Sequence, residues 1–572
     1  MRERIFSLIL IFCLIFLTVG LFYTQIVSHE KYRIMSEENR LRVVPMMAPR
    51  GSILDRNGKP LVKDVLSFNA AVIYSQIKNK EALAKFLSSI LGANEGKIWE
   101  RMEKGRFRPH SLTVVAQDIG IEKATYLEEL ETNYPGLILD VSTRRRYIND
   151  RTASNVLGYL GLINRPEFER LKQYGYRIND VVGRDGIEKN YDQYLRGTHG
   201  GKQIEVDSVG REMTTMGYKE PLPGKNVYLT IDLELQKYCD SLLEGKRGVI
   251  LAMNPSSGEV LAMSSAPGYD PEIFISRKES GSVKAVLEDK SYPLLNRAIS
   301  GAYPPGSVFK VIVAIGALET GKATPGTGFS CNGEFYLGRQ KFRCWRKGGH
   351  GEQFLTEAIK NSCNVYFYRL GLVLGVDSMA KFAEKFGFGA RTGIDLPGES
   401  EGVLPSRKWK RKHFNEQWFR GETVNYAIGQ GYLLCTPLQI AQMMSAFANK
   451  GFLVRPYLVK RVGGVDTASS VKVELDISPE SMETVRQGLW KVVNDPRGTG
   501  LKAKLEEVAV AGKTGTAQTA RKKTHGWFAG FAPFDDPKLT VVVFDEYGGK
   551  GGYYAAGTAS KVFHKAKELE LL

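Results

Sequence analysis

An uninterrupted apolar segment near the N-terminus limits what this chain can fold into. Residues 5–27 read IFSLILIFCLIFLTVGLFYTQIV and contain no charged side chain. About 20 consecutive apolar residues are enough for a helix to cross a bilayer. A cleavable signal peptide would have a shorter apolar core followed by small residues at a cleavage site. The segment therefore predicts an uncleaved transmembrane anchor, and a buried core helix is the alternative.

The charges around this anchor predict its orientation. Arg2 and Arg4 precede it, and positive charge is favoured on the cytoplasmic side of a membrane, so residues 1–4 are expected in the cytoplasm. No second apolar run follows, and we expect a bacterial inner-membrane protein with a periplasmic body. The net charge of +17 favours an anionic membrane or a polyanionic substrate. Nucleic acid is the usual partner of so basic a chain, but a body outside the cytoplasm argues against it.

Residues 28–221 are predicted to form a non-catalytic spacer or docking domain. The sequence RGSILDRNGKPL, residues 50–61, predicts two strands joined by an Asn-Gly turn. The sequence GRDGIEKNYDQYLRG, residues 183–197, predicts a glycine-bounded turn that enters a polar helix. Neither stretch contains a recognisable catalytic set.

Residues 222–572 have the pattern of an α/β domain. Thr230-Ile231-Asp232 is expected to cap a helix, and residues 248–267 predict two apolar strands around the turn at 254–258. A late strand is expected at 539–549, followed by a C-terminal helix. Strands at both ends of the region with helices between them predict one sheet that combines early and late strands.

A serine and a lysine near a helix start are the first candidates for chemistry. In GAYPPGSVFKVIVAIGALETG, residues 301–321, a Pro-Pro-Gly breaker precedes an apolar helix. Ser307 falls in the first turn and Lys310 follows three residues later, so both side chains are expected to face the same way. A serine hydroxyl needs a nearby base to become a good nucleophile, and lysine can act as that base when burial lowers its pKa. The helix start also offers backbone N–H groups to an oxyanion.

The Ser-x-x-Lys pattern alone is weak, because it also occurs at Ser28, Ser75, Ser378 and Ser469. Two downstream motifs give it weight. Ser362-Cys363-Asn364 opens a second apolar run, and Lys513-Thr514-Gly515-Thr516 is expected to end the strand-like VAVAG. Glycine at that point would let a substrate approach the backbone closely.

These three motifs, in this order, resemble those of the penicillin-recognising serine transferases and hydrolases. The resemblance covers nearly the whole chain, because RGSILDRNG, TRRRYIND-RTASNVLGYLG, GRDGIEKNYDQYLRG, TIDLELQ and HGWFAGFAP look like a class B penicillin-binding protein. It implies an elongated mixed α/β pedestal over residues 28–221 and a transpeptidase domain of the α/β (α+β) class over residues 222–572. It also implies peptidoglycan D,D-transpeptidase activity on D-Ala-D-Ala stem peptides, covalent inhibition by β-lactams, and a SEDS-type glycosyltransferase with the elongation machinery as partners.

The resemblance carries roles for the motif residues. It implies Ser307 as the nucleophile, Lys310 as its base, and Lys513 as an electrostatic support. Ser362 and Asn364 would relay protons and hold the substrate amide. For substrate binding the resemblance implies that the hydroxyls of Thr514 and Thr516 bind the terminal carboxylate beside Gly515, and that the N–H groups of Ser307 and Thr516 form the oxyanion hole.

Several related functions share these motifs. A β-lactamase would need a deacylating glutamate, and the sequence does not allow one to be placed. A β-lactam sensor would need further spans or a cytoplasmic effector, and only four residues precede the anchor. A division-type transpeptidase, a D,D-carboxypeptidase in which water accepts the acyl group, and a pedestal that activates a SEDS polymerase stay open.

The six cysteines fall into two groups. Cys13 lies in the anchor, and Cys239 and Cys435 lie in apolar surroundings typical of core residues. The second group comprises Cys331, Cys344, His350 and Cys363. Cys331 and Cys344 could form a disulfide in an oxidising compartment, the four residues could be unrelated, or three thiolates and one imidazole could hold a closed structural zinc site.

The resemblance favours zinc. Some members of the elongation-type penicillin-binding protein 2 branch carry zinc beside the second motif, held by acidic residues, a histidine and a cysteine inside that motif. Here Cys363 and His350 occupy the matching places, while Cys331 and Cys344 replace the acidic residues. The resemblance therefore implies a Cys₃His structural zinc that pins the second motif, and it favours cell elongation over division.

Overall fold

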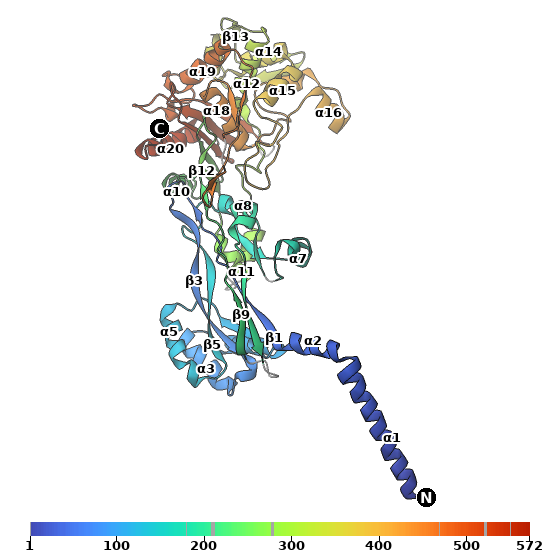
Figure 1. Cartoon of the computed structure of the whole chain (residues 1–572). Coiled ribbons are helices and arrows are strands. Elements are labelled where there is room, and N and C mark those ends of the chain that lie inside the picture. The colour runs from blue at the N-terminus through green and yellow to red at the C-terminus, as the bar shows by residue number, and fades with distance from the viewer. Residues whose placement is uncertain are drawn as a thin grey trace. The chain divides into compact units, whose positions relative to one another are not determined.

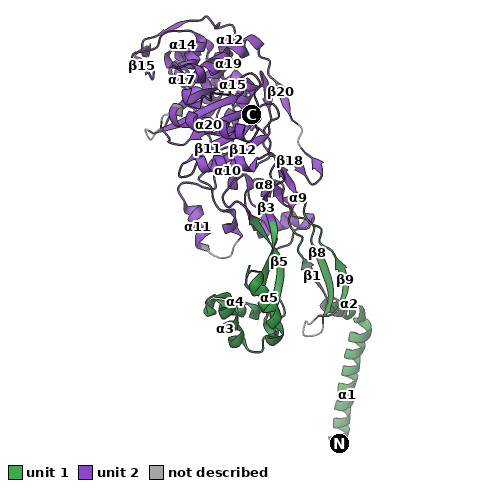
Figure 2. Ribbon diagram, turned by 90° about the vertical axis from the view of Figure 1, so that its left-hand side faces the viewer, with its two compact units in different colours: residues 1–51, 64–146, 196–224 green, residues 52–63, 147–195, 225–572 purple. Residues whose placement is uncertain are grey.

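The computed structural model describes residues 2–178, 180–206, 212–275, 280–467, 470–519, 523–549 and 551–572 (Figure 1). It divides into two compact units that interleave along the chain (Figure 2). Unit 1 contains residues 1–51, 64–146 and 196–224, and unit 2 contains residues 52–63, 147–195 and 225–572. The chain therefore passes between the units several times.

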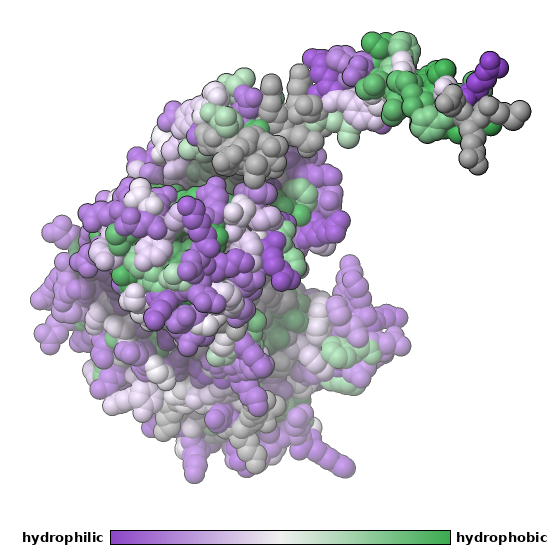
Figure 3. All heavy atoms as spheres, turned by 90° about the horizontal axis from the view of Figure 1, so that it is seen from below, coloured by the Kyte–Doolittle hydropathy of each residue, from purple (hydrophilic) through white to green (hydrophobic). Residues whose placement is uncertain are grey.

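The N-terminal segment of unit 1 is the one candidate membrane span in the part of the chain that the structure describes. Helix α1 (Arg2–Phe22) continues into a π-helical turn, Tyr23–Val27, and helix α2 (His29–Arg40) follows. The apolar stretch Arg4–Val27 has 24 residues, and none of it is buried in the protein (Figure 3). The hydroxyl of Thr18 donates to the carbonyl of Leu14 at 2.8 Å, which satisfies it without water. The composition and length suit a helix in a bilayer.

The rest of unit 1 is a mixed α/β assembly. One sheet has the order β1-β8-β9, and elsewhere the later part of β3 pairs with β4 and β5. Helices α3, α4 and α5 pack their apolar faces on β3, β4 and β5 around Val72, Leu87 and Val115. The bounds are β1 (Leu41–Met46), β3 (Pro60–Ile73), β4 (Leu112–Ala116), β5 (Leu137–Tyr147), β8 (Gly200–Val206), β9 (Glu212–Lys219), α3 (Lys80–Leu91), α4 (Glu95–Lys104) and α5 (Ile121–Leu130).

Unit 2 is built on a five-stranded sheet of order β12-β11-β23-β22-β21, antiparallel at every pairing. The strands are β11 (Gly248–Met253), β12 (Val260–Ala266), β21 (Ala511–Gln518), β22 (Thr524–Ala532) and β23 (Leu539–Asp545). The prediction that early and late strands share one sheet is thus confirmed. All residues of β11, and those of β23 from Leu539 to Phe544, are buried, so helices cover both faces.

Two groups of helices provide that cover. Helices α10 (Leu233–Leu242) and α20 (Gly551–Glu568) pack on each other and on the sheet, and α18 (Pro437–Ala448) and α19 (Pro479–Asn494) form the second group. The side chain of Asp232 accepts from the N–H groups of Glu234 and Leu235, which confirms the predicted helix cap. Cys239 and Cys435 are fully buried core residues, as predicted.

The segment 147–195 belongs to unit 2. It contains β6 (Leu160–Leu162), β7 (Val181–Gly183), and the helices α6 (Ser154–Leu157), α7 (Arg165–Leu171), α8 (Gly186–Asn190) and α9 (Asp192–Leu195). The predicted single polar helix is therefore two short helices, because Tyr191 interrupts the run and Ile187 packs into the core. A Cβ on Gly158 would lie 1.8 Å from the carbonyl oxygen of Asp185, so glycine is required at this crossing.

The strand–turn–strand prediction at residues 50–61 is confirmed. Strand β2 (Ile53–Leu54) pairs antiparallel with the start of β3 through a turn in which Gly58 has a φ of +82°. Strand β10 (Val227–Leu229) pairs with β2 and with β18 (Val459–Val462), and β18 also pairs with β19 (Val465–Asp466).

A buried ion pair ties the end of the sheet to the loop before the candidate nucleophile. The side chain of Arg297 is fully buried, and its Nε donates to Glu546 Oε2 at 2.9 Å. Its other nitrogens donate to the carbonyl oxygens of Tyr292 and Ser291. Arg247 reaches the same carboxylate from a more exposed position, at 3.3 Å.

We expect Arg297→Met to lower the free energy of unfolding by about 3–5 kcal/mol, because it leaves the Glu546 carboxylate buried beside one exposed partner. The matched variant Arg247→Met should cost about 1 kcal/mol or less, because that arginine is half exposed. Thermal unfolding of the detergent-solubilised proteins measures both effects. A larger loss for Arg247→Met than for Arg297→Met would contradict this assignment.

Candidate active site

The candidate nucleophile lies in a tight turn rather than in an α-helix. Ser307 is part of a 3-10 turn, Gly306–Phe309, that leads directly into helix α12 (Lys310–Glu319). The expected helix start at Ser307 is therefore a 3-10 turn and not an α-helical turn. The φ of +57° at Gly306 tightens the chain where it enters this turn after Pro305. Residues three apart eclipse in a 3-10 turn, so Ser307 and Lys310 still face the same way.

Glycines bring strand β21 against this turn. A Cβ on Gly515 would lie 2.8 Å from the carbonyl oxygen of Pro305, and a Cβ on Gly306 would lie 2.7 Å from that of Thr516. Real side chains do not tolerate such distances, so both positions need glycine. The backbone of the third motif thus lies directly beside the backbone of Ser307.

The third motif occupies the middle of β21 instead of ending a strand. The ladder with β22 begins at Ala511 opposite Phe531 and places Lys513 opposite Ala529. The stretch VAVAG, residues 508–512, was expected to be the strand, but β21 begins only at Ala511. Pro533, directly after the partner strand β22, has no N–H with which to continue the ladder toward residue 508.

The second motif joins two helices. Ser362 follows α13 (Leu355–Lys360), and Cys363 is the N-cap of α14 (Asn364–Leu374), as the expected helix start requires. Ser362 has a φ of +51°, a left-handed conformation that is uncommon outside glycine. Such strained positions concentrate at functional sites.

Two buried lysines meet at the hydroxyl of Ser362. Lys310 Nζ donates to Ser362 Oγ at 3.2 Å, to Ser362 O at 2.7 Å and to Asn364 Oδ1 at 2.7 Å. Lys513 Nζ donates to the same Oγ at 3.0 Å and to Thr514 O at 3.0 Å. The fold therefore brings together Lys310, Ser362, Asn364 and Lys513, which lie as much as 200 residues apart in sequence (310 to 513).

Burial shifts the protonation of both amines. It lowers the pKa of Lys310 to about 8, although the neighbouring Cys363 and Cys344 oppose the shift. Burial, and secondarily the charge of Lys310, hold the pKa of Lys513 well below its usual range. A neutral amine that can accept a proton is thus accessible near neutral pH.

The two threonines of the third motif differ in exposure. Thr516 is exposed, whereas Thr514 is buried and its Oγ1 donates to Thr499 Oγ1 at 3.2 Å. Thr499 in turn donates to the carbonyl oxygen of Lys360, two residues before the second motif begins at Ser362. Sequence reasoning missed Thr499; its position between Gly498 and Gly500 was the available local signal.

His525, the histidine of the HGWFAGFAP stretch, lies in β22 opposite Ala517. Its Nδ1 accepts from the N–H of Tyr547 at 3.2 Å, and its ring packs on Tyr303. Burial lowers the pKa of His525, which favours the neutral ring. It orders the strands beside the site.

The predicted cysteine and histidine group forms one cluster. The ligand atoms of Cys331, Cys344, His350 and Cys363 all lie within 4.8 Å of one another. Strand β13 (Phe329–Cys331) pairs with β16 (Gly351–Gln353), and β14 (Glu334–Leu337) with β15 (Gln340–Arg343), which places three of the four residues at the ends of short ribbons. Cys363 comes from the N-cap of α14.

The donor set fits a tetrahedral metal. Zn–S bonds of about 2.3 Å at tetrahedral angles put ligand atoms about 3.8 Å apart. His350 Nδ1 lies 3.6 Å from Cys331 Sγ and 3.5 Å from Cys344 Sγ, and all six cysteines of the chain are free thiols. A hydrogen bond from the Cys363 thiol lowers the pKa of Cys344 and favours its thiolate, the form that binds metal.

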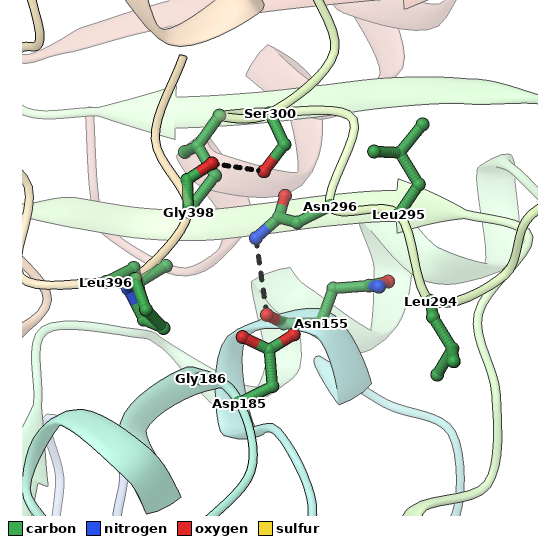
Figure 4. Close-up of a pocket in the computed structure, with 11 residues that line it drawn as sticks. Asn155, Asp185, Gly186, Leu294, Leu295, Asn296, Ser300, Leu396 and Gly398 are labelled. Atoms are coloured by element: carbon green, nitrogen blue, oxygen red, sulfur yellow. Dashed lines mark hydrogen bonds between the residues drawn. The ribbon is translucent and has the colours of Figure 1, made fainter.

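A separate cavity of about 130 Å³ lies elsewhere in unit 2 (Figure 4). Its polar walls are largely satisfied, because Asn296 Nδ2 donates to Asn155 O at 3.2 Å and Ser300 Oγ donates to Gly398 O at 2.7 Å. Burial raises the pKa of the Asp185 carboxyl. No residue of the three motifs lines this cavity. The cavity is therefore separate from the candidate active site, which the motif residues form.

Comparison with known proteins agrees with this geometry. The family model "Penicillin binding protein transpeptidase domain" matches residues 248–566, and "Penicillin-binding Protein dimerisation domain" matches residues 45–229. A curated relative, peptidoglycan D,D-transpeptidase MrdA of Haemophilus influenzae, is 33% identical over 96% of this chain and 88% of its own length.

Solved structures agree as well. Penicillin-binding protein PBP2 of Helicobacter pylori, in complex with MreC, has a TM-score of 0.82 and 30% identity over 93% of this chain and all of that one. A chain of a peptidoglycan synthase complex described as coordinating polymerization and crosslinking has a TM-score of 0.78 and 33% identity, covering 98% of this chain and 97% of that one. The chain therefore belongs to the class B penicillin-binding proteins, in the penicillin-binding protein 2 branch of peptidoglycan D,D-transpeptidases that serve cell elongation and are targets of β-lactams.

Proposed function

We propose that this D,D-transpeptidase uses Ser307 as its nucleophile and cross-links new strands at the outer face of the bacterial inner membrane, as the partner of a SEDS-type polymerase. The observation that carries the catalytic part is the pair of buried lysines that share the hydroxyl of Ser362, one of which, Lys310, follows Ser307 by three residues at the same helix start.

Acylation begins with attack of Ser307 Oγ on the carbonyl carbon of the penultimate D-Ala. Neutral Lys310 takes the hydroxyl proton, and the N–H groups of Ser307 and Thr516 stabilise the oxyanion, a contribution of about 10²–10³ in rate. Ser362 then passes a proton to the leaving nitrogen of the terminal D-Ala, and the C–N bond breaks. Asn364 holds the substrate amide, and Thr514 and Thr516 receive the terminal carboxylate beside Gly515.

The second step decides between transpeptidase and carboxypeptidase. An amine of a neighbouring stem peptide attacks the acyl-enzyme carbonyl, gives up a proton through Ser362 and Lys310, and releases Ser307 Oγ. Water in place of the amine would give a shortened stem peptide. We propose that the amine is the acceptor, because the curated relatives bear the name transpeptidase.

We propose a structural zinc ion held by Cys331, Cys344, His350 and Cys363. When bound, the metal would supply a closed crosslink and no open coordination position for catalysis. Cys363 lies between Ser362 and Asn364, so the crosslink would fix the backbone of the second motif. Three thiolates and one imidazole within 4.8 Å support this proposal.

The partner proposal rests on the printed descriptions of the relatives. The Helicobacter pylori protein is described in a complex with MreC, and the synthase complex couples polymerization with crosslinking. We propose that this chain likewise joins the elongation machinery and a SEDS-type glycosyltransferase. Arg2 and Arg4 support a cytoplasmic N-terminus with the body in the periplasm, and no nucleic acid is involved.

The base assignment predicts a pH dependence. Because the pKa of Lys310 is lowered to about 8, the neutral amine is the minor form at pH 7 and the major form at pH 9. The rate of acylation by a fluorescent penicillin should therefore rise as pH increases from 7 to 9, with its midpoint at about 8, and level off above about 9. Lys310→Arg keeps the positive charge at every pH and should abolish this reaction, as should Ser307→Ala. Covalent labelling of Ser307→Ala would refute the nucleophile.

The metal proposal predicts a stoichiometry. Elemental analysis of the purified protein should find about one zinc per chain, since the four residues would form one closed site. His350→Ala should lose the metal, whereas Cys239→Ala, which alters a buried thiol outside the cluster, should retain it. Less than about one-tenth zinc per chain, together with a mapped Cys331–Cys344 disulfide, would overturn the proposal.

The acceptor and partner proposals predict a product. The purified chain, supplied with a SEDS-type polymerase and lipid-linked precursor, should yield cross-linked muropeptide dimers that a β-lactam abolishes. Mass spectrometry of digested product measures dimers against shortened stem peptides. Shortened peptides without dimers would identify a carboxypeptidase instead.

A further inference from the structure

Helix α16 (Arg407–Phe414) concentrates positive charge on the surface of unit 2. It reads RKWKRKHF and has no acidic residue in its first turn. Lys408, Arg411, Lys412 and Arg420 are exposed, and none of them forms an ion pair with a residue that the structure describes. Figure 1 shows α16 at the edge of unit 2 beside α15 (Val376–Lys385), where Arg407 pairs with Asp377 at 3.2 Å. We call these five cations the α16 basic surface.

The physics of an isolated helix disfavours this arrangement. Arg407 and Arg411 are spaced i,i+4, as are Lys408 and Lys412, and like charges at that spacing repel. Arg407 and Lys408 in the first turn also oppose the helix dipole, whereas Arg411 and Lys412 in the last turn suit it. An ordinary solvated helix face would mix the two signs of charge, so a stripe of one sign indicates an anionic ligand.

Aromatic rings line the base of this surface. Trp409 stacks on His413 with ring centroids 4.9 Å apart and packs against Tyr432 at 5.3 Å. Phe414 and Phe419 are 50% and 61% exposed, which leaves flat apolar surface beside the cations. Such rings offer stacking surface for sugars, while the cations suit carboxylates.

The buried member of the helix fixes it in place. Lys410 has a side chain 1% exposed, forms ion pairs with Glu422 and with Glu416 at 3.3 Å, and lies 4.6 Å from the ring centre of Phe419. Its charge is therefore compensated within the protein. The positive charge that remains uncompensated faces the solvent.

The surface is continuous with the wall of the active site. Tyr432 belongs to the segment 429–432, and Gly429 O accepts a hydrogen bond from the N–H of Gly306 at 2.9 Å. Three residues of extended chain span at most about 11 Å, so the backbone of Tyr432 lies within that distance of Gly429, which contacts the nucleophile turn. A ligand on α16 would thus lie near the candidate active site.

We infer that the α16 basic surface and its aromatic base form a second peptidoglycan-binding site, which holds the anionic stem peptides of a strand beside the active site. This inference rests on the peptidoglycan substrate of the family, not on the proposed roles of Ser307 or zinc. A stem peptide ending in D-Ala carries a free terminal carboxylate and a further carboxylate on its D-glutamate residue, so a strand with repeated stems is a polyanion. The spaced cations complement that charge.

Co-sedimentation of the full-length, detergent-solubilised protein with purified peptidoglycan sacculi tests the inference. The protein is first acylated with a β-lactam, so that capture by the catalytic cleft is excluded. Charge reversal by K408E, R411E and K412E together should weaken binding about tenfold, as three lost surface contacts predict. The neutral set K408Q, R411Q and K412Q should weaken it less. Gln, Glu, Lys and Arg have similar helix propensities, so α16 is preserved in both.

Matched controls separate this surface from net charge. K290E, K460E and K561E together remove the same charge from three exposed, scattered lysines of unit 2 and should leave binding within about twofold. Binding by the unchanged protein should weaken as ionic strength rises from about 0.01 to 0.15 M, because screening lengths shorten from about 30 to 8 Å. It should also weaken when the carboxylates of the sacculi are converted to neutral amides.

Three outcomes would overturn the inference. The first is equal binding of the reversed, neutral and unchanged proteins to sacculi. The second is equal loss of binding in the scattered-lysine control. The third outcome comes from a parallel assay with vesicles that contain anionic lipid. If the charge-reversed protein lost binding to these vesicles and kept its binding to sacculi, α16 would be a membrane contact. Failure of the catalytic proposal is distinguishable, since it would appear in penicillin labelling and not in this assay.

Discussion

The site depends on two hydrogen bonds that buried lysines, Lys310 and Lys513, donate to the hydroxyl of Ser362. Lys310 has three acceptors for its three N–H donors, namely Ser362 O, Ser362 Oγ and Asn364 Oδ1, so the ammonium form is fully satisfied despite complete burial. Removal of one proton leaves a lone pair, and the longest of the three bonds, to Ser362 Oγ at 3.2 Å, is the one whose direction can reverse. Lys513 approaches the same oxygen and makes two ammonium ions side by side unfavourable. Burial lowers the pKa of both lysines, and the charge of Lys310 lowers that of Lys513 further. The fold thereby keeps a proton acceptor available at this position.

That arrangement requires Ser362 to stay in a left-handed conformation, which a serine adopts only when its surroundings impose it. The next residue, Cys363, caps α14 and belongs to the four-residue cluster. The other cluster residues come from two-stranded ribbons, and isolated ribbons of that size are marginally stable. The cluster is therefore the connection between these ribbons and the second motif, and the conformation of Ser362 depends on how firmly that connection holds.

Local patterns predicted what is decided locally. The Asp232 cap, the Asn-Gly turn at residue 58, the strands β11, β12 and β23, and the grouping of Cys331, Cys344, His350 and Cys363 all follow from short-range chemistry or from the family resemblance. Features decided by tertiary packing were not predicted. The interleaving of the two units depends on chain crossings, the position of the third motif inside β21 depends on where β22 stops pairing, and the Thr499–Thr514 hydrogen bond joins segments with no shared pattern. The 3-10 turn at Ser307 likewise follows from the contact of Gly306 with β21.

Backbone contact, rather than side-chain packing, fixes the nucleophile turn. On one side a Cβ at Gly306 would lie 2.7 Å from Thr516 O, and on the other a Cβ at Gly429 would lie 2.1 Å from Gly306 O. No side-chain layer separates these three segments, so none of them can shift without moving the turn. Rigid backbone contacts transmit displacement with little loss, because packed interiors are barely compressible. The segment 429–432 also carries Tyr432, on which Trp409 of α16 rests. One short backbone segment, residues 429–432, therefore contacts both the nucleophile turn at Gly306 and the aromatic base of α16 at Trp409.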